Sequence, residues 1–68
     1  MKYEYLLIKR NGNKDGLVYD KLFFNNSAAA RKDFRKNDII LKCKPHSVYR
    51  DMFGWSVNQP DIVKKYEK

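Results

Sequence analysis

Two strand-like segments joined by a turn sequence constrain the fold of this chain most. Residues 3–10 and 17–24 are rich in Leu, Ile, Phe and Tyr, a composition that favours β-strands. Between them, residues 11–16 read Asn-Gly-Asn-Lys-Asp-Gly and contain two residue pairs suited to the positive φ angles of hairpin turns. The sequence therefore predicts an antiparallel hairpin at the start of the fold.

Apolar residues fall on both faces of this hairpin. With residues 11–16 as the loop, Ile8 opposes Tyr19 and Leu6 opposes Lys21. These four residues share one face, and the opposite face of the hairpin is better suited to form the core.

Three explanations remain open for the apolar residues on the face of Leu6 and Ile8. The C-terminal segment covers them, a partner or a second copy binds them, or their rings stack on single-stranded RNA. The candidate apolar partner surface comprises Leu6, Ile8, Tyr19, Phe23 and Trp55.

One short amphipathic helix is predicted over residues 27–36. Asn26 or Ser27 is the N-cap, and three alanines follow. Asn37 is suited to the left-handed backbone conformation that ends a helix. The apolar side of this helix, which includes Phe34, is expected to pack onto one face of the sheet.

The rest of the chain supplies a third strand and a mixed C-terminal segment. Residues 38–44 alternate as a strand does and stop at a proline. Residues 47–57 fit a short helix and a strand equally well, and both interpretations stay open. Residues 58–61, Asn-Gln-Pro-Asp, signal the start of a final short helix, because Pro and Asp favour the first helical turn.

Together these elements indicate one small α+β domain over residues 1–68. It contains an antiparallel sheet with the hairpin, one amphipathic helix, a third strand and a mixed C-terminal segment that ends in a short helix. A chain of 68 residues supports a single small core and no deep cleft between lobes. We therefore expect its function to reside on its surface.

Positive charge is concentrated in the predicted helix. The chain has a formal net charge of +7 and a pI near 9.7, and residues 27–36 alone carry +3. On a helical wheel the cations of this segment occupy one arc, and those of the third strand enlarge the patch if the two elements adjoin. The alternative is that the charge only keeps the protein soluble. The candidate basic site comprises Arg31, Lys32, Arg35, Lys36, Lys42 and Lys44.

A clustered cationic surface is typical of proteins that bind nucleic acid or an acidic partner. We expect a non-enzymatic binding protein that contacts the phosphate backbone of RNA or DNA, as a monomer or a homodimer. The alternative is a phage-type inhibitor or regulator that docks on an acidic host protein. It rests on small size and composition, since 30 of the 68 residues are Lys, Asn, Tyr, Ile or Phe, which have AT-rich codons.

No set of residues in the sequence indicates catalysis or a metal site. Cys43 and His46 stand three apart, which is half of a zinc-ligand spacing, but there is no second pair. The polar residues 49–51 beside His46 would suit a small ribonuclease, a minor alternative to an ordinary loop. We expect no catalytic residue, no metal and no cofactor.

The sequence also predicts a cytoplasmic protein of a bacterial cell, with phage origin as an open alternative. A single cysteine cannot form the internal disulfides that small secreted domains usually contain. Residues 1–4 do not begin a secretory signal, and no apolar run has the length that a membrane requires. We therefore expect no membrane partner.

Overall fold

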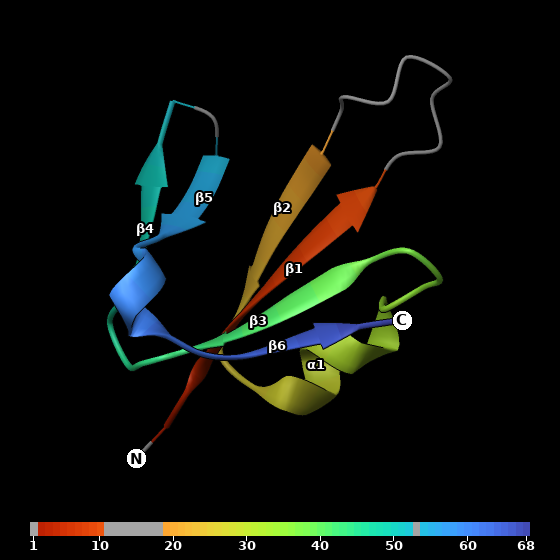
Figure 1. The fold of residues 1–68 in the computed structure, drawn as a ribbon, viewed down its shortest axis with the longest axis horizontal. Coiled ribbons are helices and arrows are strands. Elements are labelled where there is room, and N and C mark those ends of the chain that lie inside the picture. The colour runs from red at the N-terminus through yellow and green to blue at the C-terminus, as the bar shows by residue number, and fades with distance from the viewer. Residues whose placement is uncertain (1, 11–18, 53) are drawn as a thin grey trace.

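A four-stranded antiparallel sheet, one helix and a separate two-stranded hairpin make up the fold (Figure 1). The computed structural model describes residues 2–10, 19–52 and 54–68. The predicted α+β class is confirmed. The main sheet has the order β2-β1-β3-β6 and consists of β1 (Glu4–Arg10), β2 (Tyr19–Phe24), β3 (Ile39–Cys43) and β6 (Ile62–Glu67). The other elements are α1 (Ser27–Lys32), the hairpin strands β4 (Val48–Asp51) and β5 (Gly54–Val57), and the 3-10 turn η1 (Gln59–Asp61).

The pairing of β1 with β2 confirms the predicted hairpin and corrects its register. Ile8 lies opposite Lys21, and Leu6 lies opposite Phe23, so the strands are shifted by two residues from the predicted pairing. Because side chains alternate with a period of two, this shift leaves every residue on the face where it was predicted. The predicted loop, residues 11–16, lies outside the described residues.

Helix α1 covers part of one face of the sheet. It packs against β1 and β2. Ala30 of the helix is fully buried with Leu7 of β1 and Ile40 of β3, and Phe24 and Tyr66 pack around this cluster. This is the face that the sequence indicated as the better core. The helix does not fill this face, and an open hollow remains between α1 and β6.

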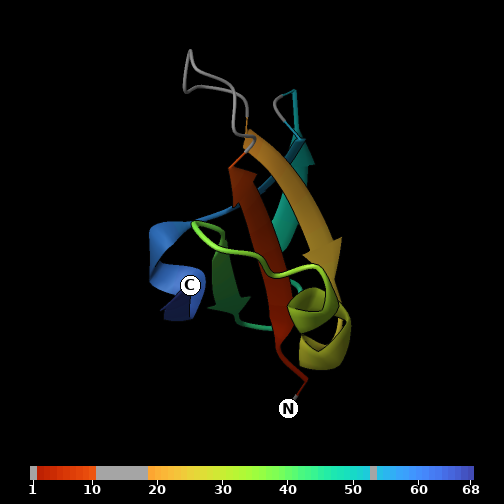
Figure 2. The same cartoon turned by 90° about the vertical axis from the view of Figure 1, so that its right-hand side faces the viewer.

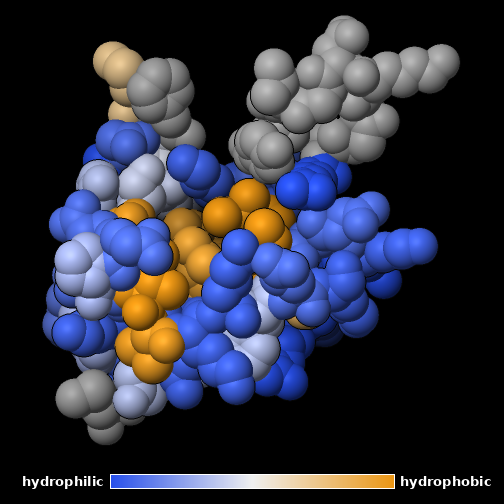
Figure 3. All heavy atoms as spheres, viewed as in Figure 1, coloured by the Kyte–Doolittle hydropathy of each residue, from blue (hydrophilic) through white to orange (hydrophobic). Residues whose placement is uncertain are grey.

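The β4–β5 hairpin lies on the opposite side of the sheet from α1 (Figures 1 and 2). Leu6 is 2% exposed there, and the ring centroids of Phe23 and Trp55 are 5.0 Å apart. Trp55 of the C-terminal segment thus covers Phe23, as one of the three explanations predicted, and the buried Leu6 has no surface left for a partner. Ile8 remains half-buried, and hydrophobic atoms show between the hairpin and the sheet (Figure 3). The side chain of Tyr19 lies outside the described part of the structure.

A carboxylate of β1 holds the β4–β5 hairpin in place. Oε1 of Glu4 accepts hydrogen bonds from the backbone N–H groups of Ser47 at 3.1 Å and Val48 at 3.4 Å. Gly54 begins β5 with a φ of 100°, a conformation that L side chains rarely adopt. Of the two interpretations of residues 47–57, the strand is correct, although the segment forms two strands and not one.

Helix α1 begins as predicted and ends early. Oδ1 of Asn26 accepts a hydrogen bond from the N–H of Ala29 at 2.8 Å, so Asn26 is the N-cap. The prediction that the helix continues to residue 36 is wrong, because it ends at Lys32 with Asp33 as its C-cap. The predicted left-handed residue, Asn37, does have a φ of 73°, but it lies in the turn that follows the helix.

The turn after α1 is fixed by the carboxylate of Asp38, which is 2% exposed. Its Oδ2 accepts a hydrogen bond from the N–H of Arg35 at 2.9 Å, and its Oδ1 accepts one from the N–H of Arg10 at 3.3 Å. These bonds tie residues 33–38 to the end of β1. Asp38 thus supplies the acceptor that the Arg35 N–H would otherwise find in a further helical turn.

The predicted C-terminal helix is a strand. The Pro60 signal produces only the three residues of η1, after which residues 62–67 pair with β3 along its free edge. A six-residue helix would be marginal by itself, whereas an adjacent strand offers a full ladder of hydrogen bonds. Ile62 and Val63 are β-branched and favour the strand as well.

Candidate nucleic-acid interface

An open groove runs along the side of the sheet that α1 covers only in part. Its first hollow, of about 460 Å³, lies between α1 and β6, and its second, of about 630 Å³, lies towards the N-terminus. Tyr5 and Ser27 line both hollows, so the two are neighbours, and we call them together the helix-side groove. The first is lined by Tyr5, Ser27, Arg31, Phe34, Ile40, Lys65, Tyr66, Glu67 and Lys68. The second is lined by Lys2, Tyr3, Glu4, Tyr5, Asn25, Asn26, Ser27, Pro45 and His46.

The ring of Tyr66 brings together a cation from the helix and a cation from the strand. Cζ of Arg31 lies 5.6 Å from the ring centroid, and Nζ of Lys64 lies 5.2 Å from it. Both distances are within the range of cation–π attraction. Tyr66 faces the helix side because it lies opposite Ile40, which is buried beneath α1. The ring therefore sets the positions of two positive charges beside the first hollow.

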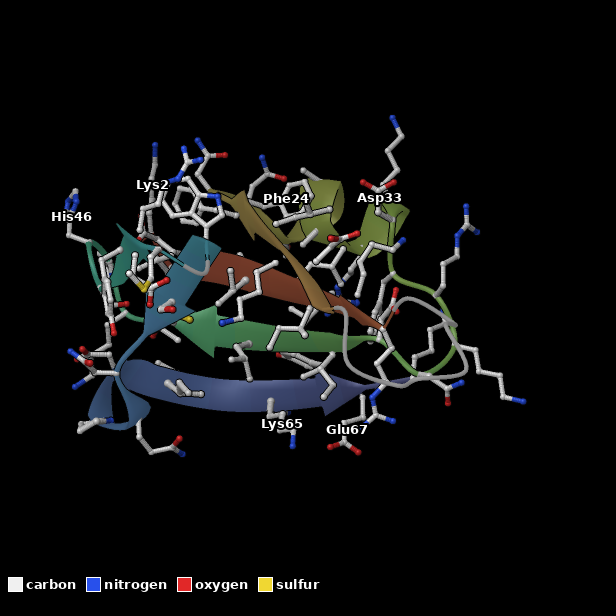
Figure 4. All side chains as sticks on the ribbon, turned by 90° about the horizontal axis from the view of Figure 1, so that it is seen from above. Lys2, Phe24, Asp33, His46, Lys65 and Glu67 are labelled. Carbon is white, nitrogen blue, oxygen red and sulfur yellow. The ribbon has the colours of Figure 1, made fainter. Side chains whose placement is uncertain are left out.

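Two further lysines rest on aromatic rings on the same side. Nζ of Lys42 lies 4.2 Å from the ring centroid of Tyr3, at the second hollow. Nζ of Lys68 lies 5.4 Å from the ring of Phe34 and donates a hydrogen bond to the Phe34 carbonyl at 3.4 Å. The helix-side groove thus has cations held on rings at both hollows. Figure 4 places Lys2 and His46 towards the opposite end of the sheet from Asp33.

The predicted basic site is divided by this arrangement. Arg31 lines the groove and Lys42 borders it. Arg35 and Lys36 lie in the turn after α1, since the helix ends at Lys32, so the four predicted cations do not form one helical face. Lys32, Arg35 and Lys36 are exposed, as is Lys44, which follows the end of β3.

Two cations of the groove, Lys64 and Lys68, and the ring of Tyr66 were not predicted from the sequence. Lys64, Tyr66 and Lys68 recur at every second residue, which is a strand signal that places them on one face. The helix expected at this point concealed the alternation. The pairing of Tyr66 with Arg31 joins segments far apart in the chain, and no local pattern indicates it.

The carboxylates near the groove already have partners. Glu67 pairs with Lys65 at 2.9 Å, and Glu4 accepts the hydrogen bonds from the start of β4. The Tyr66 ring contacts Arg31 and Lys64, and the Phe34 carbonyl accepts a hydrogen bond from Lys68. The groove therefore presents positive charge to an incoming ligand.

Cys43 is buried and resists ionisation. Burial raises the pKa of its thiol to about 11, and the nearby carboxylates of Glu4 and Asp61 contribute to the rise. The thiol is therefore protonated near neutral pH and is a poor nucleophile. Within residues 2–10, 19–52 and 54–68, no group of three or more His, Cys, Asp or Glu side chains is placed to hold a metal ion.

The polar residues considered for ribonuclease chemistry have separate neighbours. Asp51 accepts a hydrogen bond from the hydroxyl of Ser56 at 2.8 Å, and the guanidinium of Arg50 lies 5.8 Å from the Trp55 ring. His46 is exposed in a turn, with a φ of 60°.

In comparisons with known proteins, no family model, no curated protein and no solved structure matched this chain. In the part of the chain that the structure describes, no helix is long and apolar enough to cross a membrane. The function proposed below is therefore inferred from the side chains of the helix-side groove.

Proposed function

We propose that this protein binds nucleic acid without catalysing a reaction, and that the cations of the helix-side groove contact the phosphate backbone. The observation that carries the proposal is the Tyr66 ring, which holds Arg31 and Lys64 at 5.6 Å and 5.2 Å. Lys42 and Lys68 add two further ring-held charges along the same side. Charges drawn from α1, β3 and β6 converge on one surface.

Ring-held cations suit a phosphate ligand for two physical reasons. The guanidinium of Arg31 can bind two phosphate oxygens at once, while the lysines act as point charges. A side chain that already rests on a ring has less rotamer freedom to lose when the ligand binds. The cations of the groove are thus preorganised for binding an anion.

The exposed cations outside the groove have a different part in this proposal. Lys32, Arg35 and Lys36 project from the end of α1 and the turn after it, and they add to a net charge of +7. Such charges attract a polyanion over long distances and are screened by salt. They raise the rate of encounter more than they fix the ligand in place.

The test is a salt titration of binding to fluorescently labelled oligonucleotides. The groove variant Arg31→Gln with Lys64→Gln is compared with the charge-matched control Arg35→Gln with Lys36→Gln. Loss of two phosphate contacts lowers the slope of log affinity against log salt by roughly 1.4 to 1.8, and we expect this for the groove variant only. If the slope falls equally in both variants, binding depends on the net charge of the protein and not on the cations of the groove.

An acidic host protein is the alternative ligand for the same cations. Wild-type protein that binds no oligonucleotide even at low salt would exclude the proposed function. That result would direct attention to such a protein, for which a cationic surface is equally suited. The regulator or inhibitor of phage type belongs to this alternative.

A further inference from the structure

We infer that the ligand of the helix-side groove is single-stranded nucleic acid, with bases in its two hollows and phosphates on the ring-held cations. This inference rests on the proposed function and specifies its substrate. It follows from the shape of the groove, the form of α1, and the side chains that line the second hollow.

The hollows have the size of sites that take small molecules. Volumes of about 460 Å³ and 630 Å³ fall within the roughly 300 to 1,000 Å³ typical of ligand pockets. An unpaired base can leave its strand and enter such a hollow, whereas a paired base is held in the duplex stack. Because Arg31 and Lys68 line the first hollow, phosphates beside an inserted base would meet both side chains.

Helix α1 is not built to read a duplex. It has six residues, and Ala30 in its middle is fully buried against the sheet. A helix of this length spans about 9 Å, and its packed side is unavailable. Duplex readers usually present a protruding helix or strand pair to the major groove. The cations here border a concave surface, which suits a flexible strand.

The second hollow offers hydrogen-bonding groups of the kind that base edges require. Its lining includes the hydroxyl of Ser27 and the side-chain amide of Asn25, whose Oδ1 accepts a hydrogen bond from Nδ2 of Asn26. The Oδ1 of Asn26 itself is taken by the cap of α1. Tyr3 and Tyr5 add aromatic rings beside these groups. Proteins that bind single strands combine rings, polar groups and a positive groove in this way.

Trp55 provides an internal reporter of where the ligand binds. It packs on Phe23 beneath the β4–β5 hairpin, on the opposite side of the sheet from α1. A nucleic-acid strand bound in the helix-side groove should therefore leave the fluorescence emission of Trp55 unchanged. A nucleic-acid strand bound at the β4–β5 hairpin, where Arg50 lies over the Trp55 ring, should quench this emission.

The experiment compares short labelled single strands of RNA and of DNA with the duplexes of the same sequence at one salt concentration. We expect the better single strand to bind about tenfold or more tightly than its duplex, without quenching of Trp55. Tyr66→Leu should abolish this preference, while Tyr66→Phe, which keeps the ring, should retain it. Tyr3→Leu is the second variant should Tyr66→Leu fail to fold.

The outcomes separate this inference from the proposed function. Duplex binding as tight as single-strand binding would overturn the inference and leave the proposed function standing. Quenching of Trp55, with Tyr3→Leu and Tyr66→Leu both without effect, would move the site to the hairpin and also overturn it. Absence of binding to every oligonucleotide would exclude the proposed function itself.

Discussion

The ammonium group of Lys9 lies 3.8 Å from the carboxylate of Asp38, which is almost wholly buried at the end of the sheet. The same ammonium group donates a hydrogen bond to the carbonyl of Asp33 at 3.0 Å. Lys9 thus links β1 to both ends of the turn that follows α1. This turn carries Arg35 and Lys36 beyond the end of the helix.

Replacement of Asp38 should destabilise the whole domain. Asp38→Ala leaves the N–H groups of Arg10 and Arg35 without their acceptor, which should cost about 2 to 4 kcal/mol of unfolding free energy. Asp38→Asn keeps one acceptor oxygen and should cost less. Urea denaturation measures the difference, with Asp33→Ala as the exposed control. A loss in Asp38→Ala no larger than in the control would contradict the structural role of this carboxylate.

Removal of the N-cap should weaken α1. Asn26→Ala loses the hydrogen bond to the N–H of Ala29, at a cost of about 1 kcal/mol. Asn26→Ser retains a capping oxygen and should stay close to the wild type. Thermal unfolding with Asn25→Ala as the control tests the assignment, because Asn25 does not cap the helix. Equal effects of Asn25→Ala and Asn26→Ala would show that the cap is not the cause.

Alkaline pH should destabilise the protein through Cys43. The folded thiol has its pKa raised to about 11 from an ordinary value of 9.0, so the unfolded chain ionises first. Stability from this group is complete below pH 9 and is lost as the pH rises towards 11, at up to about 1.4 kcal/mol per pH unit. Urea midpoints of the wild type and Cys43→Ala isolate the effect, since the other groups titrate in both. Parallel slopes would disprove it.

Loss of the Glu4 carboxylate should loosen the β4–β5 hairpin. Glu4→Ala removes the acceptor for the N–H groups of Ser47 and Val48, at a cost of about 1 to 2 kcal/mol. Trp55 should then become more exposed, with emission shifted to longer wavelength. Glu4→Gln keeps an acceptor oxygen at the same position and should preserve the wild-type emission. An unshifted spectrum in Glu4→Ala would mean that packing on Phe23 alone holds the hairpin.

The first half of the fold could be predicted because its signals are local. Alternation with a period of two assigns Leu7 and Leu6 to opposite faces, and this holds even where the register is shifted by two residues. The side chain of Asn26 caps the helix through a contact only three residues away. Such patterns depend on neighbours in the chain and are visible without a structure.

The end of the helix and the last strand could not be predicted, because distant contacts decide them. The helical spacing continues through Phe34 and Arg35, whereas the Arg35 N–H bonds to Asp38, a residue that also bonds to the end of β1. Pro60 signals a helix locally, but the free edge of β3 makes residues 62–67 a strand. The groove is likewise non-local, since it joins Arg31 of α1 with Tyr66 of β6, which lie far apart in the chain.

Strand β6 forms one edge of the main sheet and pairs with β3. An open edge of this kind is a template for pairing with another chain, and lysines are a common means of preventing it. Lys64 and Lys65 are both exposed on this edge. We therefore expect the charge of Lys64, which we propose contacts the ligand, also to oppose pairing of β6 with the edge of a second copy. Neutral variants at this position should be checked for self-association before any loss of affinity is attributed to the groove.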